Sequence, residues 1–332
     1  MKNLKVPSFH GFKRFSEPEE AIMKISPKMK PTTHSKLWGK INKEFLGAQE
    51  FDLLTFRQPG ELNSRLASWD PGEKSLRWYR TFLNLAYSTS SSSVQKSFQN
   101  LAMKMDIGNP VSNEQSSPTN KNFSVNLDYL LAFEEFEYLE NSIVDISSIR
   151  RIVEIGAGFG RTAHVLIEKL EELENYLIFD LPEMLEVSRN YLKSTLSHKQ
   201  FEKISFTSSL DFDTSPYFDL GIQIDGFQEM PTQTIDLIYS KILSVSNYVY
   251  LQNPIGKYLP ESAGLDVKFQ EIPFNLGRSL EVFDIWNLSE VNLHYKAHLE
   301  AYRPISHELL HSMPNRLFPH YLHSIYLNDQ KV

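Results

Sequence analysis

The residues most able to do chemistry in this chain stand in one short segment, which reads E-I-G-A-G-F-G at residues 154–160. Its three glycines alternate with other residues, and glycine adopts backbone conformations that a side chain would obstruct. A turn of this composition lets a ligand lie directly against the main chain. Glu154 at its start and Asp180 further along would present carboxylates to that ligand. The segment therefore predicts a turn that binds a small molecule.

The residues around the turn predict the elements that hold it. Residues 151–155 form a short apolar run that enters the turn, and residues 162–173 carry apolar side chains at helical spacing. A second apolar run, 176–179, stops at Asp180, and Pro182 then opens another helix, where proline is tolerated. The turn and the acid are thus expected at the carboxyl edge of a sheet, where open α/β sheets bind ligands.

The same alternation of elements continues on both sides of this unit. Strands are expected at 204–207, 218–225, 248–252 and 298–303, and helices at 126–141 and 232–245. Strands that alternate with helices indicate a mostly parallel sheet covered on both faces. Residues 1–122 lack this regular alternation. Their pattern predicts helices at 36–51 and 72–86, with loops in the serine-rich run 88–93 and at 106–122. We therefore predict a mainly helical N-terminal region, 1–122, followed by an α/β domain, 123–332.

The composition excludes several classes of protein. The chain has 332 residues, a net charge of −7 and no cysteine. A protein that binds nucleic acid in general would normally be basic, and the absence of cysteine excludes disulfides, thiolate zinc sites and cysteine nucleophiles. No apolar run is long enough to span a bilayer, and the N-terminus lacks the apolar core of a signal peptide. These features lead us to expect a soluble, cytoplasmic protein.

The third glycine of the turn decides between classes of cofactor. A dinucleotide site of the form G-x-G-x-x-G would need glycine at position 161, where this chain has Arg161. A phosphate-binding P-loop is also absent, because no Gly-Lys-Ser/Thr follows the turn. The pattern E-x-G-x-G-x-G instead resembles that of class I methyltransferases, which use S-adenosyl-L-methionine. In this resemblance Asp180 accepts hydrogen bonds from both ribose hydroxyls, and Glu154 fixes the loop and helps to place the cationic methionine moiety.

Three segments make the resemblance more specific. Residues 153–160, the sequence I-F-D-L-P-E at 178–183 and the sequence F-Q-E-M at 227–230 look like those of sugar O-methyltransferases, a likeness that spans roughly residues 123–305. It implies a Rossmann-like, seven-stranded and mostly parallel sheet with a reversed last strand. It also implies a sugar hydroxyl as the methyl acceptor. Where many members of that family carry Asn-Ser, this chain has Asp225 and Gly226, which leaves the role of position 225 open.

These patterns give a set of candidate site residues. Asp225 and Glu229 lie past the expected strand 218–225, and each could equally cap a helix. Because a sugar hydroxyl is a weak acid, a base is expected, and the candidates are Asp225, Glu229 and either His294 or His298. No acidic cluster is specific enough to predict a metal site. The residues expected at the cofactor are Glu154, Gly156, Ala157, Gly158, Gly160, Asp180, Leu181, Ser208, Ser209 and Gln228.

Two other functions remain as alternatives. Residues 307–311 read H-E-L-L-H, the pattern that places two zinc-binding histidines on one face of a helix in metallopeptidases. No glutamate follows Glu308 to serve as a further ligand. The second alternative is a protein with the methyltransferase fold that binds partners without turnover. The expected partner is a small-molecule or saccharide acceptor. By analogy of fold, residues 1–122 are interpreted as a cap over the pocket that binds this acceptor. A homo-oligomer remains open.

Overall fold

The computed structural model describes residues 52–58, 72–100, 104–116, 122–210, 217–258, 276–279, 281–284 and 286–328. All of them belong to one compact unit, Thr32–Val332. The helix expected at 36–51 lies outside the described residues. Within the described part, no helix combines the length and the apolar character needed to cross a membrane.

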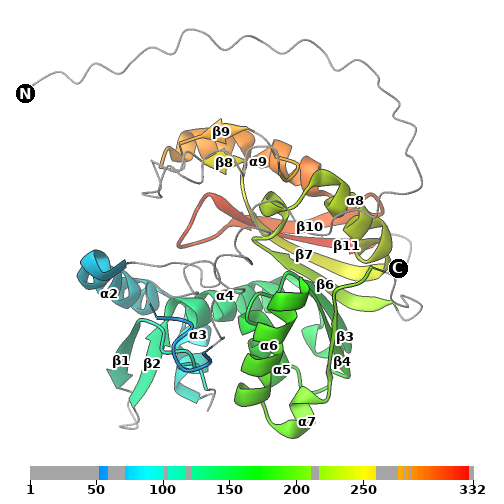
Figure 1. The fold of residues 1–332 in the computed structure, drawn as a ribbon. Helices are drawn as coiled ribbons and strands as arrows, with labels where there is room; N and C mark the ends of the chain where they lie inside the picture. The colour runs from blue at the N-terminus through cyan, green and yellow to red at the C-terminus, as the bar shows by residue number, and fades with distance from the viewer. Residues whose placement is uncertain are drawn as a thin grey trace, which may run out of the picture. The chain divides into compact units, whose positions relative to one another are not determined.

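A seven-stranded sheet forms the centre of this unit (Figure 1). The strand order is β10-β11-β7-β6-β3-β4-β5, and β11 runs antiparallel to both of its neighbours while the other pairs are parallel. The predicted sheet, with its last strand reversed, is therefore confirmed. Its strands are β3 (Arg151–Ile155), β4 (Asn175–Phe179), β5 (Ile204–Thr207), β6 (Phe218–Ile224), β7 (Ser246–Pro254), β10 (His307–Pro314) and β11 (Tyr321–Asn328).

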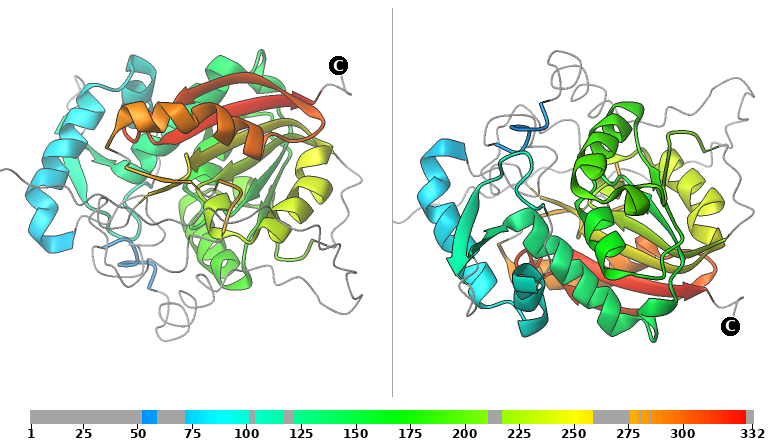
Figure 2. Two further views of the ribbon diagram at one scale, coloured as in Figure 1. Left: turned by 90° about the horizontal axis from the view of Figure 1, so that it is seen from above. Right: turned by 90° about the horizontal axis from the view of Figure 1, so that it is seen from below.

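Helices cover both faces of the sheet because its central strands are apolar on both sides (Figure 2). Ile152 of β3 belongs to a core shared with α4, α5 and α6, whereas Val153 and Ile155 belong to a core on the opposite face that includes α8. The helices are α4 (Leu127–Ser142), α5 (Arg161–Lys169), α6 (Pro182–Thr195), α7 (His198–Phe201), α8 (Thr232–Lys241) and α9 (Leu288–Tyr302). Because Glu154 alternates with these apolar residues, it points toward the first core, one residue before the end of the strand.

The described residues before α4 comprise two helices and a hairpin. Helix α2 (Gly72–Ser88) agrees with the predicted helix, and α3 (Ser92–Asn100) follows it directly. Within the stretch 106–122 expected as a loop, residues 112–116 instead form strand β1 (Ser112–Ser116). It pairs antiparallel with β2 (Asn122–Asn126), which begins at the last residue of that stretch. The strand β1 is wholly polar, so no alternation of apolar residues signalled it.

Arg57 ties the segment 52–58 to this part of the molecule. Its guanidinium is buried and donates to the Asp128 carboxylate at 2.7 Å, to Asn126 Oδ1 at 3.0 Å and to the carbonyls of Met105 and Ile107. The same group lies 4.9 Å from the centre of the Phe159 ring, inside the glycine turn. One arginine thus connects the N-terminal residues, the start of α4 and the turn.

The C-terminal part contains the clearest correction. The strand expected at 298–303 is wrong, because these residues lie at the end of helix α9 and just beyond it. Only Val291, His298 and Tyr302 of α9 are buried, a stripe too narrow to reveal a helical period. A two-residue parallel pair, β8 (Lys257–Tyr258) with β9 (Val282–Phe283), lies beside this helix.

Candidate functional site

The glycine turn connects the carboxyl end of β3 to the first residue of α5. Gly156, Gly158 and Gly160 have φ angles of +72°, +59° and +95°, so each takes a conformation that other residues rarely adopt. The Gly156 N–H donates to the carbonyl of Phe179 at 2.9 Å, which fastens the turn to the end of β4. A Cβ atom added at Gly158 would meet no atom within 4 Å, whereas one at Gly160 would lie 2.9 Å from Leu192 Cδ1. The turn is therefore packed at Gly160 and open at Gly158.

Asp180 lies directly beside the open part of this turn. Its Oδ2 accepts a hydrogen bond from the Gly158 N–H at 3.1 Å, and its Oδ1 accepts one from the Leu181 N–H at 2.7 Å. Burial raises the pKa of Asp180 to about 7, although both backbone hydrogen bonds act to lower it. Since each carboxylate oxygen accepts more than one hydrogen bond, the carboxylate is fixed in place and keeps capacity for a ligand.

Glu154 supplies a second carboxylate close to the turn. Its side chain is buried, and Tyr176 Oη donates to its Oε2 at 2.7 Å. Burial raises the pKa of Glu154 to about 7, with the hydrogen bond from Tyr176 acting in the opposite direction. The charges of Asp180 and Arg161 also act on this carboxyl, which shows that the predicted pair of acids comes together.

Arg161 and Glu135 form an ion pair that sequence reasoning missed. Both nitrogens at the end of the Arg161 side chain donate to the Glu135 carboxylate, at 3.1 and 2.8 Å, and Thr162 Oγ1 donates to it at 3.1 Å. Arg161 also donates to the carbonyl of Asp128 in α4. This residue, which excluded the dinucleotide pattern, fixes the start of α5 against α4. Neither partner could be paired from sequence, because 26 residues separate them.

Two predicted cofactor residues follow β5 at the same edge. Ser209 N–H donates to Thr207 Oγ1 at 3.2 Å, so the chain turns as soon as the strand ends. Asp180 N–H donates to the carbonyl of Thr207 at 3.2 Å, and this bond places Ser208 near the acid. Residues 211–216 beyond them are outside the described part.

Asp225 and Glu229 lie past the carboxyl end of β6, the next strand on the other side of β3. Asp225 has a φ of +55°, and its N–H donates to the carbonyl of Gln252 at 2.8 Å. Its pKa is raised to about 7, first by desolvation and then by the charge of Glu229, while a hydrogen bond from Tyr321 lowers it. The side chain is nevertheless accessible to solvent. Neither acid caps α8, whose N-cap is Pro231 and has no capping side chain.

Lys257 is a further charged group of this region that the sequence did not single out. Its side chain is only 5% exposed, and its Nζ donates to the carbonyl of Gln228 at 2.8 Å. Desolvation lowers the pKa of Lys257 to about 8, and the charge of Glu229 opposes that shift. The Gln228 side chain, predicted at the cofactor, donates to the carbonyl of Pro254 at 3.1 Å, and its Oε1 is buried without a hydrogen-bond partner.

The histidines proposed as bases are engaged elsewhere. His294 forms an ion pair with Glu281, with 2.5 Å between Nδ1 and Oε2, and its ring stacks on Phe283. His298 is buried, and burial lowers its pKa to about 3. His298 is therefore neutral at ordinary pH, and these contacts belong to α9 and the β8–β9 pair. They do not bring either histidine to the glycine turn or to Asp225.

The H-E-L-L-H segment does not have the geometry of a zinc-protease motif. It lies in the edge strand β10, which carries an irregularity between Leu309 and His311, and not in a helix. His307 is fully buried with its Nε2 3.0 Å from the carbonyl of Ser246, whereas the His311 ring stacks on Tyr138. In the described part of the chain, no group of three or more His, Asp or Glu side chains is arranged to hold a metal ion. The metallopeptidase alternative is thus wrong.

Carboxylates therefore converge on the carboxyl edge of four neighbouring strands. Because β5, β4, β3 and β6 are parallel, their ends carry Ser208, Asp180, the glycine turn and Asp225 to one edge. Desolvation is the first cause that raises the pKa of Glu154, Asp180 and Asp225, and neighbouring carboxylates raise the pKa of Glu154 and Asp225 further. The strand order and the turn after β3 agree with the predicted Rossmann-like sheet.

No family model and no curated protein sequence matches this chain. Solved structures with a related fold include the methyltransferase domain of bacterial CtHen1, with a TM-score of 0.42 and 16% identity over 61% of this chain and 100% of that one. The mitomycin 7-O-methyltransferase MmcR gives a TM-score of 0.41 and 14% identity over 60% of this chain and 56% of its own. The magnesium protoporphyrin IX methyltransferase from Synechocystis PCC 6803, with bound SAH, gives a TM-score of 0.41 and 12% identity over 65% of this chain and 90% of its own.

Proposed function

We propose that this protein transfers a methyl group from S-adenosyl-L-methionine to a hydroxyl, and that the acceptor is a sugar or a sugar-containing metabolite. The observation that carries the proposal is the position of the Asp180 carboxylate, which the Gly158 N–H holds beside the one glycine of the turn with open space next to it. A nucleoside placed there would meet a fixed carboxylate for its ribose hydroxyls and a main chain without side chains. The sugar acceptor rests on the resemblance of residues 153–160, 178–183 and 227–230 to sugar O-methyltransferases.

The charge of the site supports this cofactor over a phosphate-bearing one. Glu154 and Asp180 interact electrostatically, and Asp180 accepts its hydrogen bonds from the backbone N–H groups of Gly158 and Leu181. A pyrophosphate would be repelled by these groups, whereas a ligand with an ammonium and a sulfonium would offset them. The residues present therefore fit S-adenosyl-L-methionine, which when bound supplies an electrophilic methyl group. We assign Glu154, Gly156, Ala157, Gly158, Gly160, Asp180, Leu181, Ser208, Ser209 and Gln228 to its binding.

The protein's own contribution to the reaction is alignment and removal of a proton. The turn and Asp180 would hold the donor at the sheet edge where β6 also ends, and alignment of donor and acceptor carries much of the catalytic effect expected of such a site. Asp225, at that strand end, is our first choice for the group that accepts the hydroxyl proton as the new C–O bond forms. A pKa of about 7 suits a general base that works near neutral pH. Glu229 is positioned to raise that pKa, and His294 is the weakest of the three candidates.

Transfer of tritium from [methyl-³H]S-adenosylmethionine to a panel of neutral oligosaccharides and sugar nucleotides tests this assignment. We expect one acceptor to be labelled and Asp225→Asn to lower the rate about 10²–10⁴-fold, with unchanged affinity for S-adenosylhomocysteine. Asn is nearly the same size as Asp, so the backbone at φ +55° is preserved. Cofactor binding without transfer to any acceptor would favour the alternative of a non-catalytic binding protein.

A further inference from the structure

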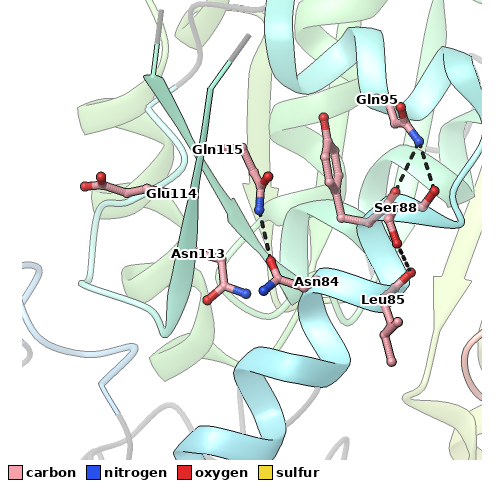
Figure 3. A pocket seen from close by; sticks show the side chains of 8 residues that line it. Asn84, Leu85, Ser88, Gln95, Asn113, Glu114 and Gln115 are labelled. Atoms are coloured by element: carbon pink, nitrogen blue, oxygen red, sulfur yellow. Dashed lines mark hydrogen bonds between the residues drawn. The ribbon is translucent and has the colours of Figure 1, made fainter.

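A second hollow lies outside this site, between α2, α3 and β1 (Figure 3). Its volume is about 670 Å³, which falls within the range of roughly 300–1,000 Å³ typical of small-molecule sites. The lining is dominated by amide side chains and contains no Lys or Arg. It consists of Asn84, Leu85, Tyr87, Ser88, Gln95, Asn113, Glu114 and Gln115.

Two of the amides hold each other in place across the hollow. Gln115 Nε2 of β1 donates to Asn84 Oδ1 of α2 at 2.9 Å (Figure 3). Asn113, also on β1, donates from Nδ2 to the carbonyl of Arg80 at 2.8 Å. Each amide therefore uses one end to fix its orientation. The other ends, which are Asn84 Nδ2 and the side-chain oxygens of Asn113 and Gln115, remain available to a ligand.

Gln95 is fixed in the same way on the opposite side. Its Nε2 lies within hydrogen-bond distance of the carbonyls of Tyr87, Ser88 and Ser90, at 3.3, 3.4 and 3.1 Å (Figure 3). Its side-chain oxygen is thereby left for the hollow. Side chains that are already ordered lose little entropy when a ligand binds, so this arrangement has the character of a preformed site.

The lining selects against a charged ligand. Side chains of a strand alternate between its faces, and Figure 3 shows Asn113 and Gln115 directed toward α2 while Glu114 between them points the other way. Apart from the Glu114 carboxylate, which points away from α2, the side chains that line the hollow are neutral. The lining offers no positive side chain to pair with a phosphate and no carboxylate on the α2 side to pair with an ammonium, whereas a neutral ligand with many hydroxyls finds both donors and acceptors here.

The apolar part of the lining fits the same kind of ligand. Leu85 is 60% exposed, so its side chain offers apolar surface at the hollow. The Tyr87 ring is held by edge contacts with Phe98 and Phe123, with centroids 5.7 and 5.9 Å apart. A sugar ring carries hydroxyls around its rim and C–H groups on its faces, so it can use the amides and these apolar groups together.

We propose that this hollow binds a neutral sugar unit of the acceptor, other than the unit that is methylated. This inference rests on the proposed function for the identity of its ligand. The hollow would give the region before α4 a role in substrate choice. Arg316 of the β10–β11 connection fixes that region, because it donates to the carbonyl of Ala86 at 2.8 Å. A longer saccharide would then be bound at two places and presented to the sheet edge in one register.

Nuclear magnetic resonance of the full-length ¹⁵N-labelled protein tests the proposal without any need for turnover. The side-chain amide signals of Asn84, Asn113 and Gln115 are followed during titration with maltose, cellobiose, lactose and N,N′-diacetylchitobiose. We expect at least one disaccharide to shift these signals, and Asn84→Asp and Gln115→Glu to weaken its binding about tenfold each. Both changes nearly preserve size, and Asn190→Asp on the exposed surface of α6 is the matched control.

Two results would overturn the inference. One is that none of the four disaccharides shifts these signals, and the other is that the variants bind the disaccharide as tightly as Asn190→Asp does. Binding of S-adenosylhomocysteine is measured in the same samples and should be equal in all of them. Loss of that binding in the unaltered protein would contradict the proposed function alone, because the disaccharide titration reads the hollow independently.

Discussion

The contrast between Gly158 and Gly160 gives a sharp prediction about which part of the turn faces the cofactor. Alanine at Gly158 would have to adopt φ near +59°, in the left-handed region, but its Cβ would meet no protein atom within 4 Å. The left-handed conformation costs about 1–2 kcal/mol for an L-residue, and alanine recovers roughly 0.4–1 kcal/mol through the unfolded chain. We therefore expect Gly158→Ala to reduce the free energy of unfolding by only about 1 kcal/mol.

Alanine at Gly160 should behave differently. Its φ of +95° lies outside the left-handed well, and its Cβ would lie 2.9 Å from Leu192 Cδ1 and 3.1 Å from Cγ. Leu192 is fully buried, so it cannot move into solvent to relieve the contact. Overpacking of a core costs about 1–3 kcal/mol and backbone strain a similar amount. We expect Gly160→Ala to lose about 2–5 kcal/mol.

Thermal unfolding and calorimetric titration with S-adenosylhomocysteine separate these two effects. Gly158→Ala should keep nearly the normal melting temperature and yet bind the ligand about 10–100-fold more weakly, because its methyl group fills the space beside Asp180. Gly160→Ala should melt earlier. Normal affinity in a well-folded Gly158→Ala variant would refute the reasoning, since the open side of the turn would then not be the side that meets the ligand.

Two further predictions concern the acids and the buried arginine. The pKa values of Glu154 and Asp180 are raised to about 7, above those of an unfolded chain, so the ligand-free protein should lose stability from about pH 4 to 7 as both acids ionise. Affinity for S-adenosylhomocysteine should rise over about pH 6–8 for the same reason. Urea unfolding checks the first trend and calorimetry the second, and an affinity that falls with pH would contradict the prediction. Arg57→Met should lower the free energy of unfolding by about 3–5 kcal/mol because it leaves the Asp128 carboxylate buried without its guanidinium. Addition of Asp128→Asn should restore part of the loss. Equal urea midpoints for the single and the double variant would show that the unpaired carboxylate does not cause the destabilisation.

The strands and the position of the glycine turn could be predicted because their signals are local. Strands 151–155 and 204–207 agree with β3 and β5 at both ends, since each is a short segment with apolar residues, flanked by charged or turn-forming residues. The seven-stranded order with one reversed strand came from the resemblance of the motifs, because hydrophobic period alone does not encode the order of strands. The positions of Asp180 and Asp225 followed from a single physical rule, that parallel strands end at one edge.

The remaining features depend on contacts that a linear pattern does not contain. Strand β1 is built from polar residues such as Asn113 and Gln115, and it pairs with β2, whose Phe123 and Val125 pack against the core. Helix α9 buries too few side chains to show a period, although Asn287, which caps it by accepting from the Glu290 N–H, was a readable start signal. Lys257 and the Arg161–Glu135 pair could not have been found, because the fold alone brings their partners to them.

Calorimetric titration with S-adenosylhomocysteine of the unaltered protein, Asp180→Ala and the control Asp145→Ala tests the central claim most directly. Asp145 is an exposed acid that caps the short helix η3 (Ile146–Ser148), before the amino end of the same strand β3. We expect micromolar binding to the unaltered protein and to Asp145→Ala, and binding at least about tenfold weaker to Asp180→Ala, which loses charge-assisted hydrogen bonds to the ribose. Absence of binding to the unaltered protein, or equal binding by all three, would contradict it.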